Sequence, residues 1–233
     1  MNDDASVRRG VIRYALREYF GVLFIAVLLG VTSGRGDWVA GLALVGLYFT
    51  WVTATLLVLA PRSPGLLAER AQRRHQNTKG WDKAILALFG VETLARYVVA
   101  GLDQRFGWSP ELPVAVQAAG AVACAAGFAL VLWSMVANAW FSHVVRLQEE
   151  RSQQVASGGP YAWVRHPGYL GTFGFELGSG LLLGSWPAVA IGACGVALLT
   201  VRTALEDRTL HRELAGYAEY AGRVRYRLLP GVW

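Results

Sequence analysis

Long apolar runs, separated by short polar or basic segments, dominate the hydrophobic pattern of this 233-residue chain. A helix needs about 20 mostly apolar residues to cross a bilayer core of roughly 30 Å. A backbone in lipid must also satisfy its own hydrogen bonds, which favours helices. The pattern therefore predicts an all-α integral membrane protein with five to six transmembrane helices. The six predicted spans are residues 18–32, 38–60, 81–102, 113–141, 168–183 and 187–201.

The predicted spans fall into two regions. Residues 1–112 form an N-terminal transmembrane region with three spans and a basic loop, residues 61–83. Residues 113–233 form a C-terminal core with the other three spans. Only the segment Gly184-Ser185-Trp186-Pro187 separates the last two spans, so we expect them to form a tight hairpin.

Composition and charge support a membrane protein. Apolar residues make up 54% of the chain and charged residues 16%, where soluble proteins have roughly a quarter charged. Of the 22 basic residues, all but Arg35, Arg96 and Arg105 fall in the N-terminus, two alternate loops and the C-terminal tail. These residues are Arg8, Arg9, Arg13, Arg17, Arg62, Arg70, Arg73, Arg74, Lys79, Lys83, Arg146, Arg151, Arg165, Arg202, Arg208, Arg212, Arg223, Arg225 and Arg227.

The charge distribution predicts the orientation of the chain. By the positive-inside rule, both termini and the basic loops face the cytoplasm, across the inner membrane if the cell is bacterial. The same rule accounts for the net charge of +6 without a nucleic-acid partner. Cys124 and Cys194 lie in apolar runs and are predicted to be packing residues, so no metal site is expected. No small-residue cleavage signal follows the first apolar segment, which is expected to stay in the protein.

Three ionisable residues lie inside predicted spans: Glu92, Arg96 and Glu176. Glu92 and Arg96 are four residues apart, so they can form an ion pair on one helix face. Glu176 has no partner nearby in sequence. It either binds substrate or pairs with an arginine from another helix.

An irregular polar segment precedes the fifth span. Glycines and prolines surround Tyr161 and His166, and Pro167 suits the first turn of the helix that follows. Irregular backbone at membrane depth is tolerated only where it is buried in protein or lines a cavity. Its free N–H and C=O groups can bind a polar ligand.

A second polar cluster follows the sixth span. Arg202 and Glu206 are four residues apart, with Asp207 beside them, and one reading is an ordinary surface ion pair. However, the hairpin between the last two spans brings this cluster to the same side as the His166 segment. We therefore predict that the two polar segments form one site that opens toward the cytoplasm.

Both segments resemble a known family. The matching runs are Ser142-His143-Val144-Val145, Gly159-Pro160-Tyr161-Ala162-Trp163-Val164-Arg165-His166-Pro167-Gly168-Tyr169, and Arg202-x-x-x-Glu206-Asp207-x-x-Leu210 followed by Tyr217-x-x-Tyr220. In order and spacing they resemble the isoprenylcysteine carboxyl methyltransferases, within the wider phospholipid and isoprenylcysteine methyltransferase superfamily. The resemblance covers about residue 140 to the C-terminus, and the first three spans match only in hydropathy.

The resemblance implies a methyltransferase that binds S-adenosyl-L-methionine without a Rossmann domain, in a pocket formed by residues 142–169 and the C-terminal tail. Consistently, no Gly-x-Gly-x-x-Gly motif is present. The implied cofactor-binding residues are Gln153, Gln154, Val155, Ala156, Tyr161, His166, Pro167, Gly168, Tyr169 and Glu206. The implied catalytic residues are Arg202 and Glu206, and Arg202 and Glu176 are the predicted substrate-binding residues. The chain departs from the family at residues 153–156, where the family has His-Thr-Leu-Val, at Arg146, which replaces glutamine, and at Asp207, which replaces glutamate.

The expected reaction is carboxyl O-methylation of a lipidated or hydrophobic acceptor, such as an isoprenylcysteine. A carboxylate is already a nucleophile, so the protein has only to align the reactants and exclude water. The first alternative is a phospholipid or amine N-methyltransferase, in which Glu206, Asp207 or His166 acts as a base. Further alternatives are an NADPH-dependent membrane reductase, which usually has more spans, and a non-catalytic scaffold or transporter, for which no internal repeat is seen.

Overall fold

The computed structural model describes residues 2–72 and 77–233 and confirms the all-α fold, since every regular element in these residues is helical. Arg73 and Arg74, two basic residues of the predicted loop 61–83, lie outside the described residues. The helices are α1 (Asn2–Ser33), α2 (Val39–Arg62), α3 (Pro64–Arg70), α4 (Gly80–Phe106), α5 (Val114–Ala137), α6 (Pro167–Leu182), α7 (Trp186–Glu213) and α8 (Tyr217–Arg223). Two 3-10 turns, η1 (Glu149–Arg151) and η2 (Gly159–Ala162), lie between α5 and α6.

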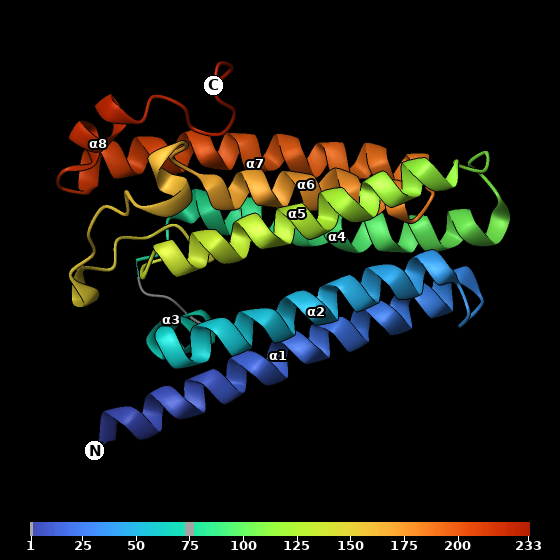
Figure 1. Cartoon of the computed structure of the whole chain (residues 1–233), viewed down its shortest axis with the longest axis horizontal. Coiled ribbons are helices and arrows are strands. Elements are labelled where there is room, and N and C mark those ends of the chain that lie inside the picture. Colours follow the sequence, from blue (N-terminus) through green and yellow to red (C-terminus); the bar gives the residue numbers. More distant parts are fainter. Residues whose placement is uncertain (1, 73–76) are drawn as a thin grey trace.

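The number of spans agrees with the prediction of five to six. Within the described residues, α1, α2, α4, α5 and α7 are long and apolar enough to cross a membrane. Helix α6 has 16 residues, which gives it a length of about 24 Å at 1.5 Å per residue. It packs against α5 and α7 inside the bundle, as Figure 1 shows.

The fourth span ends earlier than predicted. Helix α5 stops at Ala137 because Asn138 takes an extended conformation, with φ −134° and ψ 102°. The Asn138 side chain then accepts a hydrogen bond from the Trp140 backbone N–H at 2.9 Å. Trp140 and Phe141 are therefore released from the helix into the loop that builds the candidate site.

Glycines bring α5 and α6 into close contact. A Cβ atom added to Gly127 would lie 2.3 Å from the carbonyl oxygen of Gly171, and one added to Gly171 would lie 2.6 Å from that of Gly127. The backbones approach each other equally closely at Gly120 of α5 and Gly178 of α6, where an added Cβ atom on either residue would collide with the carbonyl oxygen of the other. Small residues are typical of membrane helix interfaces because they allow such close backbone approach. This packing fixes α6, whose first turn carries the His166 segment.

The predicted pairing of Glu92 with Arg96 is confirmed, with Arg96 Nε 3.5 Å from Glu92 Oε1. Arg96 also donates through Nη2 to Glu176 Oε1 at 3.0 Å and through Nη1 to the Glu176 carbonyl at 2.9 Å. The partner of Glu176 is therefore an arginine from another helix. A Cβ atom on Gly195 would lie 2.4 Å from Glu176 Oε2, so this glycine makes room for the cluster. These contacts tie α4, α6 and α7 together.

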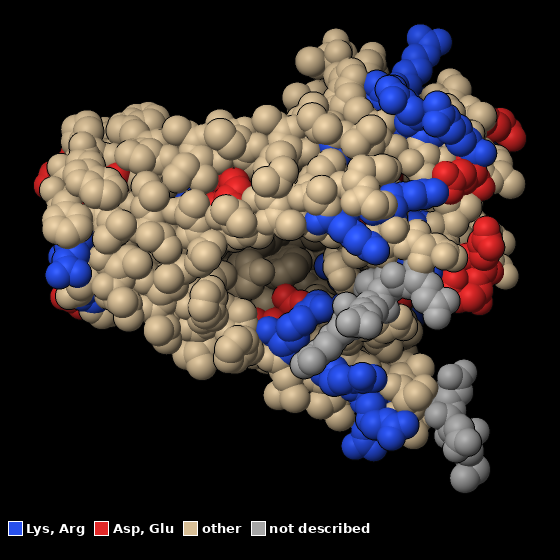
Figure 2. Space-filling model, turned by 180° about the vertical axis from the view of Figure 1, so that it is seen from behind, with Lys and Arg blue, Asp and Glu red and all other residues tan. Residues whose placement is uncertain are grey.

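Charged residues gather at one end of the molecule, as the face in Figure 2 shows. The start of α1, helix α3 and helix α8 lie at that end in Figure 1, which fits the predicted alternation of basic and non-basic loops. The cytoplasmic orientation of this end stays a prediction. Helix α4 packs against both α1 and α7, so the two predicted regions share one bundle, and their division at residue 112 likewise stays a prediction.

Candidate active site

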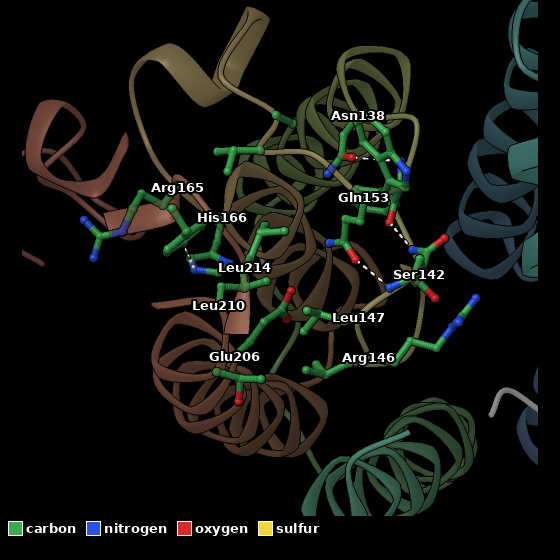
Figure 3. A pocket seen from close by; sticks show the side chains of 18 of the residues that line it. Asn138, Ser142, Arg146, Leu147, Gln153, Arg165, His166, Glu206, Leu210 and Leu214 are labelled. Carbon is green, nitrogen blue, oxygen red and sulfur yellow. Dashed lines mark hydrogen bonds between the residues drawn. The ribbon is translucent and has the colours of Figure 1, made fainter. Parts of the chain in front are cut away.

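A polar pocket of about 880 Å³, open mouth included, lies at the charged end of the bundle. Figure 3 shows Ser142 and Gln153 of the α5–α6 loop on one side and Glu206 of α7 on the other. Nine of the ten residues predicted to bind the cofactor line this pocket: Gln153, Gln154, Val155, Ala156, Tyr161, His166, Gly168, Tyr169 and Glu206. Pro167 is buried in the first turn of α6 and is not part of the lining.

Side-chain hydrogen bonds fold the loop around the pocket. The Gln153 amide oxygen accepts from the backbone N–H of Gln148 at 2.8 Å, and Gln148 Nε2 donates to the Trp140 carbonyl at 2.7 Å. Asn138 Nδ2 donates to the hydroxyl of Tyr161 at 3.1 Å. Burial raises the pKa of the Tyr161 hydroxyl, so it stays protonated. Gln153 therefore holds its own loop as well as lining the pocket.

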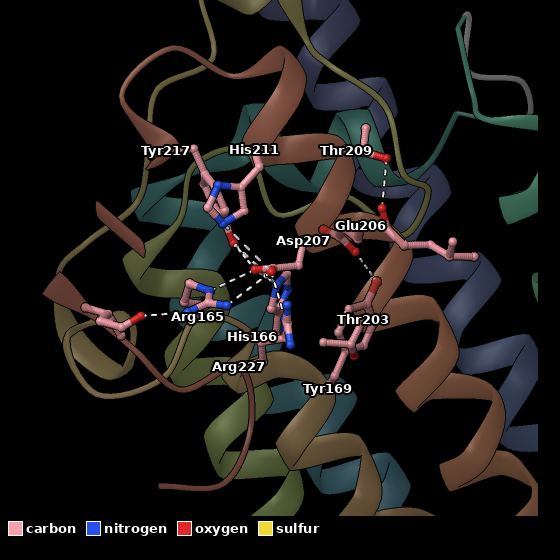
Figure 4. Close-up of polar contacts among 12 residues, drawn as sticks. Arg165, His166, Tyr169, Thr203, Glu206, Asp207, Thr209, His211, Tyr217 and Arg227 are labelled. Atoms are coloured by element: carbon pink, nitrogen blue, oxygen red, sulfur yellow. Dashed lines mark hydrogen bonds and ion pairs between the residues drawn. The ribbon is translucent and has the colours of Figure 1, made fainter. Parts of the chain in front are cut away.

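Asp207 holds the His166 segment on α7, as Figure 4 shows. Its carboxylate accepts from Arg165 Nε at 2.8 Å, from Arg227 Nε at 2.8 Å and from the Tyr217 hydroxyl at 2.9 Å. His166 Nε2 lies 3.3 Å from Asp207 Oδ1. Burial and the nearby Asp207 carboxylate raise the pKa of the Tyr217 hydroxyl, which therefore remains a donor.

The C-terminal tail forms part of the same support. Its carbonyl groups accept hydrogen bonds from the backbone N–H groups of Arg165 and His166, each at 2.9 Å. Sequence reasoning missed Arg165 and Arg227 as site-building residues, because both were counted among the cytoplasmic basic residues. The position of Arg165 inside the family motif was the signal that could have identified it.

The interpretation of Arg202 and Glu206 as a surface ion pair is wrong. The Tyr169 hydroxyl donates to the Glu206 carboxylate, and both residues line the polar pocket. Arg202 is only 6% exposed and pairs instead with Asp82 of α4, which is fully buried.

Asp82 was not singled out from the sequence. It lies between Trp81 and Lys83 at the start of a span, where a single acid among basic residues gave a weak signal. Its Oδ1 accepts from Arg202 Nε at 2.7 Å, and its Oδ2 accepts from the backbone N–H of Val145 at 2.7 Å. Asp82 therefore joins α7 to the loop that lines the pocket.

A larger and more apolar cavity of about 1230 Å³, its opening to solvent included, lies between the helices and is lined by residues of α1 to α7 and of the α5–α6 loop. Figure 2 shows a hollow on the face that it draws, with uncharged residues on one side and charged residues along its lower rim. Arg202 and Glu176, the two predicted substrate-binding residues, line this cavity and not the polar pocket.

The polar pocket and the apolar cavity share one wall. It consists of Phe141, Ser142, Gly168 and Tyr169, which line both spaces. A Cβ atom on Gly168 would lie 2.7 Å from the Phe141 ring, so glycine is needed for the ring to lie there. The guanidinium of Arg202 lies 5.3 Å from the centre of the Tyr169 ring, on the cavity side.

These features define a polytopic helical membrane protein with a two-chambered site. Residues 119–212 match the model of the isoprenylcysteine carboxyl methyltransferase (ICMT) family. The chain is 34% identical over 92 residues to the protein-S-isoprenylcysteine O-methyltransferase of Homo sapiens and 44% identical over 43 residues to that of Saccharomyces cerevisiae. These matches show a likeness to the ICMT family over part of the chain. They cover 36% and 18% of this chain and 30% and 18% of those relatives, so the chain spans less than a third of the relatives' length.

A solved structure extends the likeness to the whole fold. The structure is that of the eukaryotic intramembrane Ras methyltransferase ICMT, and it matches 98% of this chain and 94% of its own with a TM-score of 0.50. The two sequences are 17% identical, so the match shows a shared fold alone. It includes the first three spans, for which the sequence offered only hydropathy.

Proposed function

We propose that this chain is an integral membrane methyltransferase that uses S-adenosyl-L-methionine to methylate the carboxylate of a lipidated or hydrophobic acceptor, such as an isoprenylcysteine. The observation that carries the proposal is the wall that the polar pocket and the apolar cavity share, formed around Tyr169 and Phe141. A charged, soluble methyl donor and a lipid-tailed acceptor need two such spaces that meet at one point.

The residues of the polar pocket fit the donor. Glu206 offers a negative charge to a cationic ligand, and the Tyr169 hydroxyl holds this carboxylate in place beforehand. Gln154 adds an amide, and Leu210 and Leu214 add apolar surface for a flat ring. S-Adenosylmethionine, when bound, supplies a methyl group that its sulfonium already activates.

Arg202 is placed to hold the acceptor carboxylate at the cavity side of the wall. Its Nε and Nη2 bind Asp82 and the His143 carbonyl, while Nη1 makes no hydrogen bond within the described residues. Nη1 can therefore donate to a carboxylate, and Asp82 keeps the guanidinium plane fixed. Arg202 is only 6% exposed, so the pairing takes place where few water molecules reach the guanidinium and electrostatic interactions are stronger than in bulk water.

The contacts around the possible bases favour O-methylation over N-methylation. An amine acceptor needs a base to remove its proton. His166 is engaged with Asp207 and Tyr217, and Asp207 is held by two arginines. Of the three bases considered from the sequence, Glu206 remains, but it lines the polar pocket and not the apolar cavity. Glu176 lines the cavity, but its carboxylate is paired with Arg96. A carboxylate acceptor needs no base.

The test is transfer of a radiolabelled methyl group by the purified full chain in lipid nanodiscs. The acceptors are S-farnesylcysteine with a free carboxylate, its methyl ester as a blocked control, and phosphatidylethanolamine. We expect label on the free carboxylate alone. Label on phosphatidylethanolamine alone would show an N-methyltransferase, and absence of S-adenosylmethionine binding by calorimetry would contradict the whole proposal.

A further inference from the structure

One arginine of the apolar cavity has no carboxylate partner. Among the described residues, three arginines line the cavity. Two of them bind carboxylates, Arg96 that of Glu176 at 3.0 Å and Arg202 that of Asp82 at 2.7 Å. The third, Arg70 at the end of α3, makes no ion pair within residues 2–72 and 77–233, and residues 73–76 contain no Asp or Glu. Its charge is therefore available to a ligand that brings an anionic group.

The acidic residues near Arg70 bind other arginines. Glu69, which precedes it in the chain, lies 3.3 Å from Arg146 Nη2. Glu18 of α1 lies 2.6 Å from Arg17 Nη2, while Arg17 Nη1 donates to the backbone carbonyl of Arg70 at 2.7 Å. Each of these carboxylates is thus already engaged by a cation. The surroundings of Arg70 leave its own positive charge uncompensated.

Contacts with Phe141 hold the Arg70 guanidinium in place. Nη1 donates to the Phe141 carbonyl at 3.4 Å, and the guanidinium lies 5.5 Å from the centre of the Phe141 ring. Nε is buried and makes no hydrogen bond within the described residues. Nη2 makes none in that part of the chain either, but it keeps accessible surface. Because the side chain lines the cavity, Nη2 is the nitrogen that a ligand can reach.

Arg70 and Arg202 bind the same short stretch of the α5–α6 loop. Arg202 Nη2 donates to the His143 carbonyl at 2.7 Å, two residues after the carbonyl that accepts from Arg70. Two residues of extended chain span about 7 Å at most. Residues 141–143 line the cavity, and the first two of them also line the polar pocket. Both guanidinium groups are therefore held at the end of the cavity where the reaction is proposed to occur.

We propose that Arg70 selects acceptors with a second anionic group close to the methylated carboxylate, so that the preferred acceptor is a lipidated cysteine at the end of an acidic peptide. The inference rests on the proposed function, which places the reacting carboxylate at Arg202 and the hydrocarbon tail in the cavity. The amide on the amino side of the cysteine is then the remaining direction in which the acceptor extends. A carboxylate on that side would accept a charge-assisted hydrogen bond from Arg70 Nη2.

The experiment measures binding and needs no methyl transfer. Two unlabelled probes displace radiolabelled S-farnesyl-N-acetylcysteine from the purified full chain in neutral detergent: S-farnesyl-N-succinylcysteine and S-farnesyl-N-butanoylcysteine. Their N-acyl chains are equally long, but only the succinyl chain ends in a carboxylate. Its two carboxyl carbons are separated by as many bonds as the carbonyl carbons of residues 141 and 143. We expect the succinyl probe to bind about tenfold more tightly.

Two variants and one matched control assign the preference to Arg70. Arg70→Gln removes the charge and should reduce the preference to about twofold or less, while Arg70→Lys keeps a cation and should retain at least about threefold. Arg62→Gln makes the same change at an exposed residue outside the cavity, which donates to the Val58 carbonyl at 3.2 Å, and should keep the full preference.

The ratio of the two affinities separates recognition from a structural role. Arg70 also contacts Phe141, so its loss can disturb the wall between the two spaces. Such a disturbance weakens both probes equally and leaves their ratio unchanged. Only a direct contact with the second carboxylate makes the ratio depend on the charge of residue 70.

The phosphate of an anionic lipid offers Arg70 the same chemistry as a second carboxylate. The displacement is therefore repeated in nanodiscs of phosphatidylcholine, with and without phosphatidylglycerol. We expect the preference in both. A preference that is present in phosphatidylcholine and lost with phosphatidylglycerol would assign Arg70 to lipid head groups and overturn the proposal.

The remaining outcomes separate this inference from the proposed function. Equal affinity for the two probes, no displacement by either probe, or a preference that survives Arg70→Gln would overturn the inference. If S-farnesylcysteine is methylated while the preference is absent, the inference fails alone. If the preference is present but no acceptor is methylated, Arg70 stands as an anion-binding residue and the proposed reaction fails.

Discussion

The guanidinium of Arg202 on α7 lies against the carboxylate of Asp82 on α4, with Nε 2.7 Å from Oδ1 and Nη2 3.3 Å from Oδ2. Asp82 is fully buried and also accepts the backbone N–H of Val145. One carboxylate therefore orients the predicted substrate-binding arginine and fixes the loop of the polar pocket. Removing one partner of a buried ion pair leaves the other charge uncompensated.

We predict that Asp82→Asn lowers the stability of the protein and weakens binding of the acceptor. The free energy of unfolding should fall by about 3 kcal/mol or more, measured by denaturation in detergent. Transfer kinetics, measured where the variant is folded, should show a larger rise in KM for the acceptor than for the donor, because Arg202 lines the apolar cavity. Asp82→Glu should recover part of both losses. The exposed neighbour offers a control, Lys83→Gln, and equal effects on both KM values would contradict a positioning role.

Glu206 and Arg202 should have separable effects on cofactor binding. We predict that Glu206→Gln weakens S-adenosylmethionine binding by about 10-fold to 100-fold, because it removes the pocket's carboxylate charge. Arg202→Lys keeps a cation opposite Asp82 and should leave cofactor binding within about threefold, while transfer to the acceptor falls. Calorimetric titration of both variants measures this. Cofactor binding that is lost in Arg202→Lys and kept in Glu206→Gln would reverse the two assignments.

Hydropathy and the family motifs were enough to predict the bundle and nine of the residues that line the polar pocket. Residues 161–169 lead into α6 and form its first turn. Helices α6 and α7 form a hairpin, so Glu206 in the last part of α7 lies at the same end of the bundle as the start of α6. Chain connectivity alone therefore brings Tyr161, His166 and Glu206 together, and their shared location in one pocket needed no knowledge of tertiary packing.

The separation into two chambers could not be predicted in this way. Asp82 and Arg202 are 120 residues apart, and their contact depends on how α4 packs on α7, which an apolar pattern does not specify. Arg70 posed the same difficulty, since a basic residue in a loop is expected on charge grounds alone, and only the structure shows that it lines the cavity. Glu176 was the intermediate case. Its burial was evident, but its partner Arg96 was identified only by the structure.

The contact between α5 and α6 predicts a strong effect from the smallest possible substitution. In Gly171→Ala, the new Cβ atom would lie 2.6 Å from the Gly127 carbonyl oxygen and 2.9 Å from a Val131 methyl group. We expect the free energy of unfolding to fall by about 1–3 kcal/mol, since such overpacking forces backbone shifts. Gly90→Ala in α4 is the matched control. It meets no atom within 4 Å and should gain up to about 1 kcal/mol in helix propensity. Equal stability of the two variants would show that the helices do not approach this closely.

The orientation of the bundle can be tested at its two ends. In a background with Cys124 and Cys194 replaced by alanine, single cysteines are introduced by Arg225→Cys and Glu111→Cys. Both positions are exposed, the first in the basic C-terminal tail and the second in the segment between α4 and α5. The positive-inside rule predicts that the basic end faces the cytoplasm. A membrane-impermeant maleimide should therefore label Glu111→Cys in intact cells, and Arg225→Cys only after permeabilisation.

The reverse labelling pattern would place the polar pocket on the outer side of the membrane. S-Adenosylmethionine is made in the cytosol, so that result would also contradict the proposed donor. Labelling of both cysteines in intact cells would instead contradict the number of spans between residues 111 and 225, and with it the hairpin that brings His166 and Glu206 to one mouth. The same two variants thus test the topology and one premise of the proposed reaction.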